Sequence, residues 1–339
     1  MKSLHAATLS FILFTMGACA SHPQTPDWIN GPSEKYKAEQ FLIGRGQAAS
    51  AEEARDRARA DLAKIFQVSV SVESEDVQTY MQKSDAAGGS AKPAGEYAAQ
   101  ASRRITTHAD QIVEGVQVAE TWQDPLTRTH FALAVLPRLQ ASQRLRQEIE
   151  GLDAATRKYL AEARGATDIL AKIGAASHAL DAQLERAGYQ KSLSIVDPTG
   201  RGEEPEWNTA KLGADLAELL NRVHLATDAP DVPPGFAAAV NGAVAGAGFL
   251  IETGVQPDYV LEARLPLENL GLREGWYWQH GTLEVTLKET GSNRVRGSRR
   301  WDIKSSAQDP AVSRQRALDQ AASILKKELR DTLIGFSSP

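Results

Sequence analysis

Gly44, Gly46 and Ala49 have the spacing of a dinucleotide-binding fingerprint, Gly-x-Gly-x-x-Ala. That motif requires a second, parallel strand further along the chain, which is buried on both faces and therefore continuously apolar. Residues 67–73 instead alternate valine with polar residues, the pattern of a strand with one face in water. We therefore interpret the two glycines as structural residues that allow a tight turn and close backbone approach, and we expect no nucleotide cofactor.

Other catalytic patterns are missing from the sequence. None of the seven histidines lies four residues from another, which is the spacing of a helical zinc site. No serine occupies a Gly-x-Ser-x-Gly elbow. Acidic residues fall on predicted helix faces or loops, where solvated charge is the usual state. The sequence predicts a protein that is not an enzyme and that uses neither a metal nor a cofactor.

Cys19, the single cysteine, follows a predicted signal peptide at residues 1–18. This segment has a basic start and an apolar stretch too short to be a permanent membrane span. The run Met16-Gly17-Ala18-Cys19 resembles a bacterial lipoprotein box, in which the cysteine is acylated, for example with palmitate, and becomes the mature N-terminus. The alternative is an ordinary signal peptide with an incidental cysteine.

Several acyl chains on one residue give stable membrane anchoring. Ala20 stands where some bacterial lipoproteins carry an aspartate that retains them at the inner membrane. That resemblance implies anchoring at the periplasmic face of the outer membrane. Residues 19–26, with two prolines, form the predicted tether. Because no thiol remains for a disulfide, the fold must be stabilised by its core.

Length and charge set further limits. A chain of 339 residues suggests two domains. The formal charge of −5 becomes −6 when residues 1–18, with one lysine and no acidic residue, are removed. A mildly acidic chain is a poor general binder of nucleic acid, so we expect no nucleic-acid partner. After the signal peptide no apolar run is long enough to cross a bilayer.

The pattern of residues 27–138 predicts the first α+β domain. A strand begins at Phe41, and a capping box of Ser50 and Glu53 starts a helix at Ala51. The apolar stripe of this helix is mostly alanine, so it can lie close to a sheet. The strand at residues 67–73, a loop at 84–96 and a helical stripe over 97–112 follow. Alternating residues then predict strands over 116–122 and 131–135, joined as a hairpin.

Several motifs in this domain resemble a known family: Pro26-x-Trp28-Ile29, Tyr36, Gly44-x-Gly46-x-Ala48 and the alanine-rich helix. Together they are similar to the small bacterial outer-membrane lipoprotein (Lpp-type) family named for a twenty-kilodalton member. They also resemble the N-terminal part of the flagellar assembly protein FlgT. The resemblance covers residues 26 to about 138. It implies a non-catalytic periplasmic α+β domain without a cofactor and supplies no catalytic residues.

Residues 139–187 predict a helical connector with a weak heptad pattern. It is either a single coiled-coil rod that makes a dimer seam or two helices that bend near Gly151 or Gly165 and pack on their own chain. We favour two helices, because glycine weakens a helix interior. The oligomeric state stays open.

Residues 188–339 predict the second α+β domain. Gly188 caps the connector, a strand starts at Leu193, and a helix covers 212–223. A second helix, over 236–249, precedes three alternating strands over 259–265, 283–287 and 295–303. A final helix covers the sheet. The predicted fold class is therefore α+β, with two sandwich-like domains of mixed or antiparallel sheets joined by a long helical segment.

Two groups of residues in the second domain are candidates for binding a partner. The first is a basic row predicted to lie opposite Trp301: Arg294, Arg296, Arg300 and Lys304. It would hold an anionic partner; its alternative is a solvated row that prevents edge pairing. The second is Trp276 and Trp278, which would stack on sugar rings; their alternative is core and rim packing.

The sequence thus predicts a lipid-anchored binding or assembly factor in the cell envelope, with an envelope protein as its partner. A flagellum-associated accessory and an activator of wall synthesis are the two candidates within this class. A cell-wall glycan-binding module or glycan-acting enzyme that uses the two tryptophans is the alternative.

Overall fold

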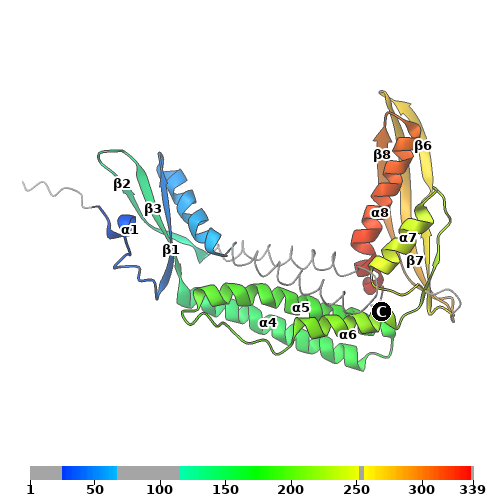
Figure 1. Ribbon diagram of the computed structural model, residues 1–339, viewed down its shortest axis with the longest axis horizontal. Coiled ribbons are helices and arrows are strands. Elements are labelled where there is room, and N and C mark those ends of the chain that lie inside the picture. The colour runs from blue at the N-terminus through cyan, green and yellow to red at the C-terminus, as the bar shows by residue number, and fades with distance from the viewer. Residues whose placement is uncertain (1–24, 67–114, 252–255, 337–339) are drawn as a thin grey trace, which may run out of the picture.

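The computed structural model describes residues 25–66, 115–251 and 256–336. The signal peptide, Cys19, most of the tether, and the predictions for residues 67–112 lie outside the described residues. Two β-sheets stand at the two ends of a helical hairpin and project to the same side of it (Figure 1). The α+β class, with more than one sheet and a long helical segment between them, is confirmed.

The N-terminal sheet has three antiparallel strands in the order β1-β3-β2. Its strands are β1 (Phe41–Ala48), β2 (Gln117–Gln123) and β3 (His130–Pro137). Pairing of β2 with β3 confirms the predicted hairpin. Residues 51–66 form the predicted helix, and Glu53 N donates to the capping oxygen of Ser50 at 3.2 Å.

Gly44 and Gly46 lie inside strand β1, so the prediction that they form a turn is wrong. Their role is close approach to the helix at residues 51–66. A Cβ on Gly46 would lie 1.9 Å from Ala54 O, and one on Gly44 would lie 2.4 Å from Ala58 O. Since both distances are far below van der Waals contact, the helix can lie on this strand only because these positions lack side chains.

Both faces of the N-terminal sheet are covered. One face packs its alanines against the 51–66 helix, through Ala48, Ala54, Ala58, Ala132 and Ala134. The other face carries Leu133 and Val135, which pack against Trp28 of helix α1 (Asp27–Asn30). The single-turn α1 is held in place by a hydrogen bond from Trp28 Nε1 to Glu120 Oε2, 2.7 Å. Among the described residues, both faces of this sheet therefore contribute to packed clusters.

The connector is a pair of packed helices, α4 (Arg138–Gly165) and α5 (Ile169–Val196). Of the two alternatives, the structure has two helices that pack on their own chain. The break lies at residues 166–168, where Asp168 caps α5 by accepting from Ala171 N at 2.9 Å. Helix α5 continues past Gly188, so the strand predicted to start at Leu193 is wrong. Leu193 and Val196 instead pack against the first domain, as part of a cluster with Leu62 and Phe66.

The C-terminal part begins with helix α6 (Thr209–Asn221) and ends with α8 (Pro310–Gly335). Its five strands are β4 (Leu225–Asp228), β5 (Tyr259–Arg264), β6 (Leu267–Arg273), β7 (Trp276–Glu289) and β8 (Val295–Ala307). Strand β8 runs along one edge of β7, and β6 and β5 share the other edge. The short β4 pairs parallel to β5, so the sheet is mixed. The three predicted strands and the final helix are confirmed.

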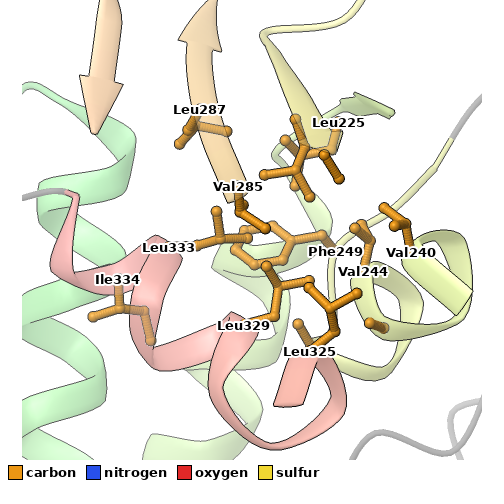
Figure 2. Close-up of a cluster of buried hydrophobic side chains, with 14 of the residues drawn as sticks. Leu225, Val240, Val244, Phe249, Val285, Leu287, Leu325, Leu329, Leu333 and Ile334 are labelled. Carbon is orange, nitrogen blue, oxygen red and sulfur yellow. The ribbon is translucent and has the colours of Figure 1, made fainter. Parts of the chain in front are cut away.

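A single core fills the space between this sheet and its helices. Leu325, Leu329 and Leu333 of α8 meet Val285 and Leu287 of β7 (Figure 2). Val240 and Val244 of α7 (Phe236–Gly246) close the same core. Leu170 and Ile173 from the start of α5 also belong to it. The helical hairpin is therefore joined to the C-terminal sheet by apolar packing and does not act as a loose linker. The domain boundaries proposed from the sequence stay predictions.

Candidate functional site: the open face of the C-terminal sheet

The long strand β7 separates a buried face from an open one. Leu283, Val285 and Leu287 are at most 1% exposed, because they point into the core under α8. The residues between them are partly exposed along the whole strand. Within the described parts of the chain, no helix covers this second face. We refer to it as the open face.

Ion pairs between neighbouring strands cover much of the open face. Glu284 of β7 accepts from Arg300 of β8 at 2.8 Å, and Lys288 of β7 donates to Glu262 of β5 at 2.6 Å. Asp302 accepts from Lys304 at 2.7 Å and lies 2.8 Å from the His280 ring. These hydrogen bonds, from Lys304 first and then from His280, lower the pKa of Asp302. Most of this surface thus carries charges that are already matched.

The predicted basic row is not a single row of free cations. Arg300 and Lys304 lie on the open face, each bonded to a carboxylate. Arg296 falls at a β-bulge of β8 and turns to Asp168 at the start of α5, with Nη1 2.6 Å from Oδ2. Its side chain is only 14% exposed. Arg294 precedes the strand, at the β7–β8 turn. The structure brings together two of the four cations and gives Arg296 a structural partner.

The end of the sheet away from the helical hairpin has a different character. A two-residue turn, Glu274-Gly275, joins β6 to β7, and its φ angles are 51° and 81°. Positive φ at both positions is typical of a type I′ turn, which makes a rigid hairpin. Large apolar side chains near this turn are exposed: Leu272 by 59%, Trp276 by 40% and Trp278 by 39%. We call these three residues the hairpin tip.

Both tryptophans project from the open face, because alternation along β7 places them on the side of His280. Trp278 lies between Gly271 of β6 and Ser306 of β8, two small residues, and it is 39% exposed. The structure therefore brings together the two tryptophans that the sequence singled out. Two exposed indoles on a rigid hairpin provide apolar area with polar edges, the composition of a binding hot spot.

Sequence reasoning missed Leu272 and the whole of β6. The signal was available: Glu-Gly followed by alternating residues resembles the Asp-Gly type of hairpin turn. Asp168, which holds Arg296, was also missed, because the two residues are far apart in sequence.

The described residues contain neither a helix that is long and apolar enough to span a bilayer nor a group of three or more side chains suited to hold a metal. The comparison with protein families finds a match in the N-terminal part of the chain. Residues 26–137 match the LPP20 lipoprotein family. The LPP20 match covers about a third of the chain and supports an envelope lipoprotein. It agrees with the predicted lipoprotein resemblance, and the Lpp-type and FlgT likenesses stay predictions.

No curated protein matches the chain. Among solved structures, the secreted protein HP1454 from Helicobacter pylori covers 88% of this chain and 98% of its own, at 10% identity and a TM-score of 0.38. A lipoprotein from Caulobacter crescentus, described as putative, covers 33% and 88%, at 14% identity and a TM-score of 0.25. A minor lipoprotein from Acinetobacter baumannii covers 33% and 94%, at 13% identity and a TM-score of 0.28.

Proposed function

We propose that this chain is a non-catalytic lipoprotein, anchored through Cys19 at the periplasmic face of the outer membrane, that binds an envelope protein through the hairpin tip. The observation that carries the proposal is the exposure of Leu272, Trp276 and Trp278 on a rigid hairpin, at one end of a sheet whose open face carries cross-strand ion pairs. Exposed tryptophans of this kind are enriched at the centres of protein interfaces.

The helical hairpin supports a tethering mechanism. A helix of 28 residues is about 42 Å long at about 1.5 Å per residue, so α4 and α5 hold the two sheets tens of ångströms apart. The N-terminal sheet follows the anchor, and the C-terminal sheet carries the tip. Anchoring would keep the tip near the membrane and raise its effective concentration toward a partner there.

The experiment is site-specific photo-crosslinking in cells with a photoreactive residue at Trp278, compared with one at Asp56 on the first domain. We expect a protein adduct at Trp278 that is absent at Asp56, and mass spectrometry of the adduct identifies the partner. A flagellar basal-body component or a wall synthase would decide between the two roles proposed for this class. Equal labelling at both positions, or none at Trp278, contradicts the proposed tip.

The anchor has its own test. We expect wild type in the outer-membrane fraction and the Cys19→Ser variant in the soluble fraction. If both are soluble, the lipid anchor is wrong, whereas the tip is still judged by the crosslinking.

A second function is favoured by the placement of both indoles on one face, where they could stack on neighbouring sugar rings of cell-wall glycan. Under this alternative, the mature protein sediments with purified cell-wall sacculi, and the Trp276→Ala, Trp278→Ala double variant does not. Failure to sediment excludes the glycan-binding role and leaves the protein partner.

A further inference from the structure

Strand β8 forms one edge of the C-terminal sheet. Among the described residues it pairs only with β7, and the register is continuous from Gly297 to Ala307. An edge strand presents backbone N–H and C=O groups that have no partner in the sheet, so it is a template for a strand of another chain. The backbone groups along this edge therefore decide where a second strand can pair.

Helix α8 occupies the part of the edge near the hairpin tip. Lys304 N donates to Gln320 Oε1 at 3.2 Å, and Ser306 O accepts from Arg316 Nη1 at 2.7 Å. The backbone groups of Lys304 and Ser306 thus point away from β7 and are used within the chain. Another strand cannot form regular hydrogen bonds with this part of β8.

The middle of the edge is open. In an antiparallel ladder, every second residue directs both of its backbone groups to the same side. Because Lys304 and Ser306 face outward, Ser298, Arg300 and Asp302 do so as well. Their backbone groups have no hydrogen-bond partner among the described residues. A second strand can therefore pair with this short stretch of β8.

The side chains on this stretch alternate in charge. Arg300 is 70% exposed and uses Nη2 for Glu284, so that Nε and Nη1 have no partner among the described residues. Asp302 is 55% exposed and contacts Lys304 and His280, but each of its oxygens can accept a second hydrogen bond. A row of like charges would prevent edge pairing, whereas adjacent opposite charges can pair with a copy of themselves.

The charges match when two copies of β8 pair antiparallel about a two-fold axis at Trp301. Arg300 then lies opposite Asp302 of the second copy, and Asp302 lies opposite Arg300 of the second copy. Each facing pair exchanges two backbone hydrogen bonds through its outward groups and adds an ion pair on the open face. The sequence Arg-Trp-Asp is therefore self-complementary in this register.

Neighbouring registers fit less well. An axis at Arg300 or at Asp302 places like charges opposite each other, and so does parallel pairing in register. An axis at Ile303 places Asp302 opposite Lys304, but the N–H of Lys304 is already bonded to α8. The axis at Trp301 meets the requirements of both the charges and the backbone groups.

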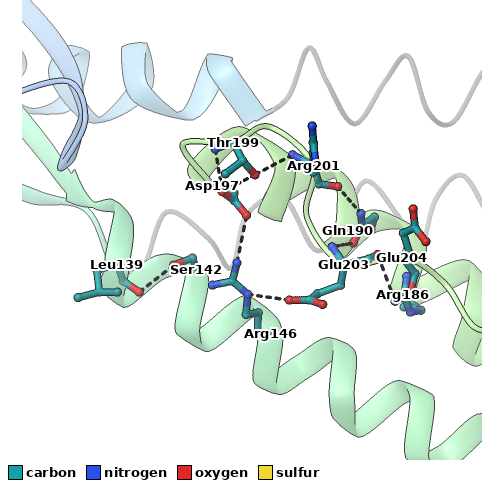
Figure 3. Close-up of polar contacts among 10 residues, drawn as sticks. All are labelled: Leu139, Ser142, Arg146, Arg186, Gln190, Asp197, Thr199, Arg201, Glu203 and Glu204. Atoms are coloured by element: carbon teal, nitrogen blue, oxygen red, sulfur yellow. Dashed lines mark hydrogen bonds and ion pairs between the residues drawn. The ribbon is translucent and has the colours of Figure 1, made fainter.

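Polar groups along the helical hairpin are instead matched within the chain. Residues 197–208 run along the hairpin and are bonded to both of its helices (Figure 3). Arg146 of α4 donates to Asp197 Oδ2 at 3.0 Å, and Gln190 of α5 donates to Arg201 O at 3.0 Å. This surface therefore offers a second copy less than the edge of β8 does.

We propose that a second copy of this chain pairs with β8 about the axis at Trp301, so that two C-terminal sheets form one continuous sheet. The axis is perpendicular to the sheet. The two open faces therefore lie on the same side of the dimer, and the two hairpin tips lie at its opposite ends. This dimer does not depend on what the hairpin tip binds.

The test is sedimentation equilibrium of the full-length mature protein in a density-matched detergent, in which only the protein contributes to the mass. We expect a concentration-dependent equilibrium between monomer and dimer. Arg300→Asp and Asp302→Arg each place like charges opposite each other, so each should raise the dissociation constant of the dimer at least about tenfold. An equimolar mixture of the two variants should dimerise again, because each then carries the charges that complement the other.

Lys288→Glu is the control, because it changes a charge on the same open face away from this edge and should dimerise like wild type. Circular dichroism shows whether each variant is folded. If a single variant is not, the double variant Arg300→Asp, Asp302→Arg decides, because it restores opposite charges and should dimerise. The proposal is overturned if wild type is monomeric throughout, or if the mixture and the double variant stay monomeric. A dimer that neither single variant weakens also overturns it, because the copies would then meet through their acyl chains or another surface.

Discussion

The two sheets of this protein differ in how many of their faces are buried by other elements. The N-terminal sheet is covered on both faces, by an alanine-rich helix on one and by Trp28 with its neighbours on the other. Within the residues that the structure describes, helices cover the C-terminal sheet on one face only, through large aliphatic residues of α8 and α7. Its other face is an array of ion pairs that ends in two exposed tryptophans.

This difference indicates a division of labour. In the first sheet, the helix at residues 51–66 packs directly on the backbone of β1. We therefore expect substitutions there to change mainly the stability of the fold. In the second, the open face contributes little to the core, so a change there is felt mainly in binding. Exposed ion pairs contribute little to stability, about 0 to 1 kcal/mol each. A variant of the first sheet that changed only binding, or a variant of the open face that strongly lowered stability, would contradict this comparison.

The largest effect on stability is expected from Gly46→Val in the first sheet. A Cβ at this position would lie 1.9 Å from Ala54 O and 2.4 Å from Ala58 N, and both are backbone atoms that cannot rotate away. We expect a loss of more than about 4 kcal/mol, or failure of the N-terminal sheet to form. Circular dichroism and chemical denaturation measure it.

The matched control is Gly151→Ala in α4, where an added Cβ meets nothing within 4 Å. Alanine in a helix interior is expected to stabilise the protein by about 0.5–1 kcal/mol. An unchanged unfolding midpoint for Gly46→Val would show that the helix does not rest on the strand as the structure has it.

The next largest effect is expected from Trp28→Ala. This side chain is 2% exposed, packs on Leu133 and Val135, and donates to Glu120. Its removal leaves a cavity and an unmet carboxylate oxygen, so we expect a loss of about 3–5 kcal/mol. Denaturant unfolding checks this value. A loss below about 1 kcal/mol would mean that this face of the first sheet is not a packed core.

The sequence predicts elements well where a local pattern determines them. The cap at Ser50 and the alternation along residues 283–287 are local signals, and the helix and strand that they predict are present. The strand predicted to start at Leu193 is wrong because a short, mostly apolar segment fits either a strand or a helix, and packing against Leu62 and Phe66 favours continuation of α5.

The candidate site was predictable only in part. The two tryptophans share a face because alternation is a local rule. The fate of Arg296 depends on a β-bulge and on Asp168, 128 residues away, and neither is a local signal. Gly46 was predicted to be a structural residue. Its position inside a strand, where it lies against the 51–66 helix, is not shown by the glycine spacing alone.

A smaller effect is expected at the joint between the helical hairpin and the second sheet. Asp168 caps α5 and bonds Arg296, so Asp168→Asn should cost about 1–2 kcal/mol at pH 7. Burial acts to raise the pKa of Asp168, but hydrogen bonds from Ala171 N and Arg296 outweigh it, and the net pKa is lowered. Arg296 and Tyr259 are the ionisable groups that interact with it.

The sign of the pH dependence follows from that lowered pKa. A depressed carboxyl pKa contributes stability above the unfolded value, about 3.9, and this contribution is lost as the pH falls through the folded value. The stability gap between wild type and Asp168→Asn should therefore shrink below about pH 4. Asp56→Asn, in an exposed pair with Arg59, is the control and should show a gap of less than about 0.5 kcal/mol throughout. A gap for Asp168→Asn that is independent of pH would argue against the ionised pair.

The smallest effect on stability belongs to the double variant Trp276→Ser, Trp278→Ser. Both rings are about two-fifths exposed and lie outside the core cluster, so we expect a change of less than about 0.5 kcal/mol in unfolding free energy. The envelope partner identified by photo-crosslinking should nevertheless no longer co-purify with this double variant. This is the reverse of Trp28→Ala, which removes the same type of side chain from the covered sheet.

If the double variant instead unfolds the protein like Trp28→Ala, the tip is part of the core and the division between the two sheets is wrong. If it is stable and still binds, the partner recognises another surface.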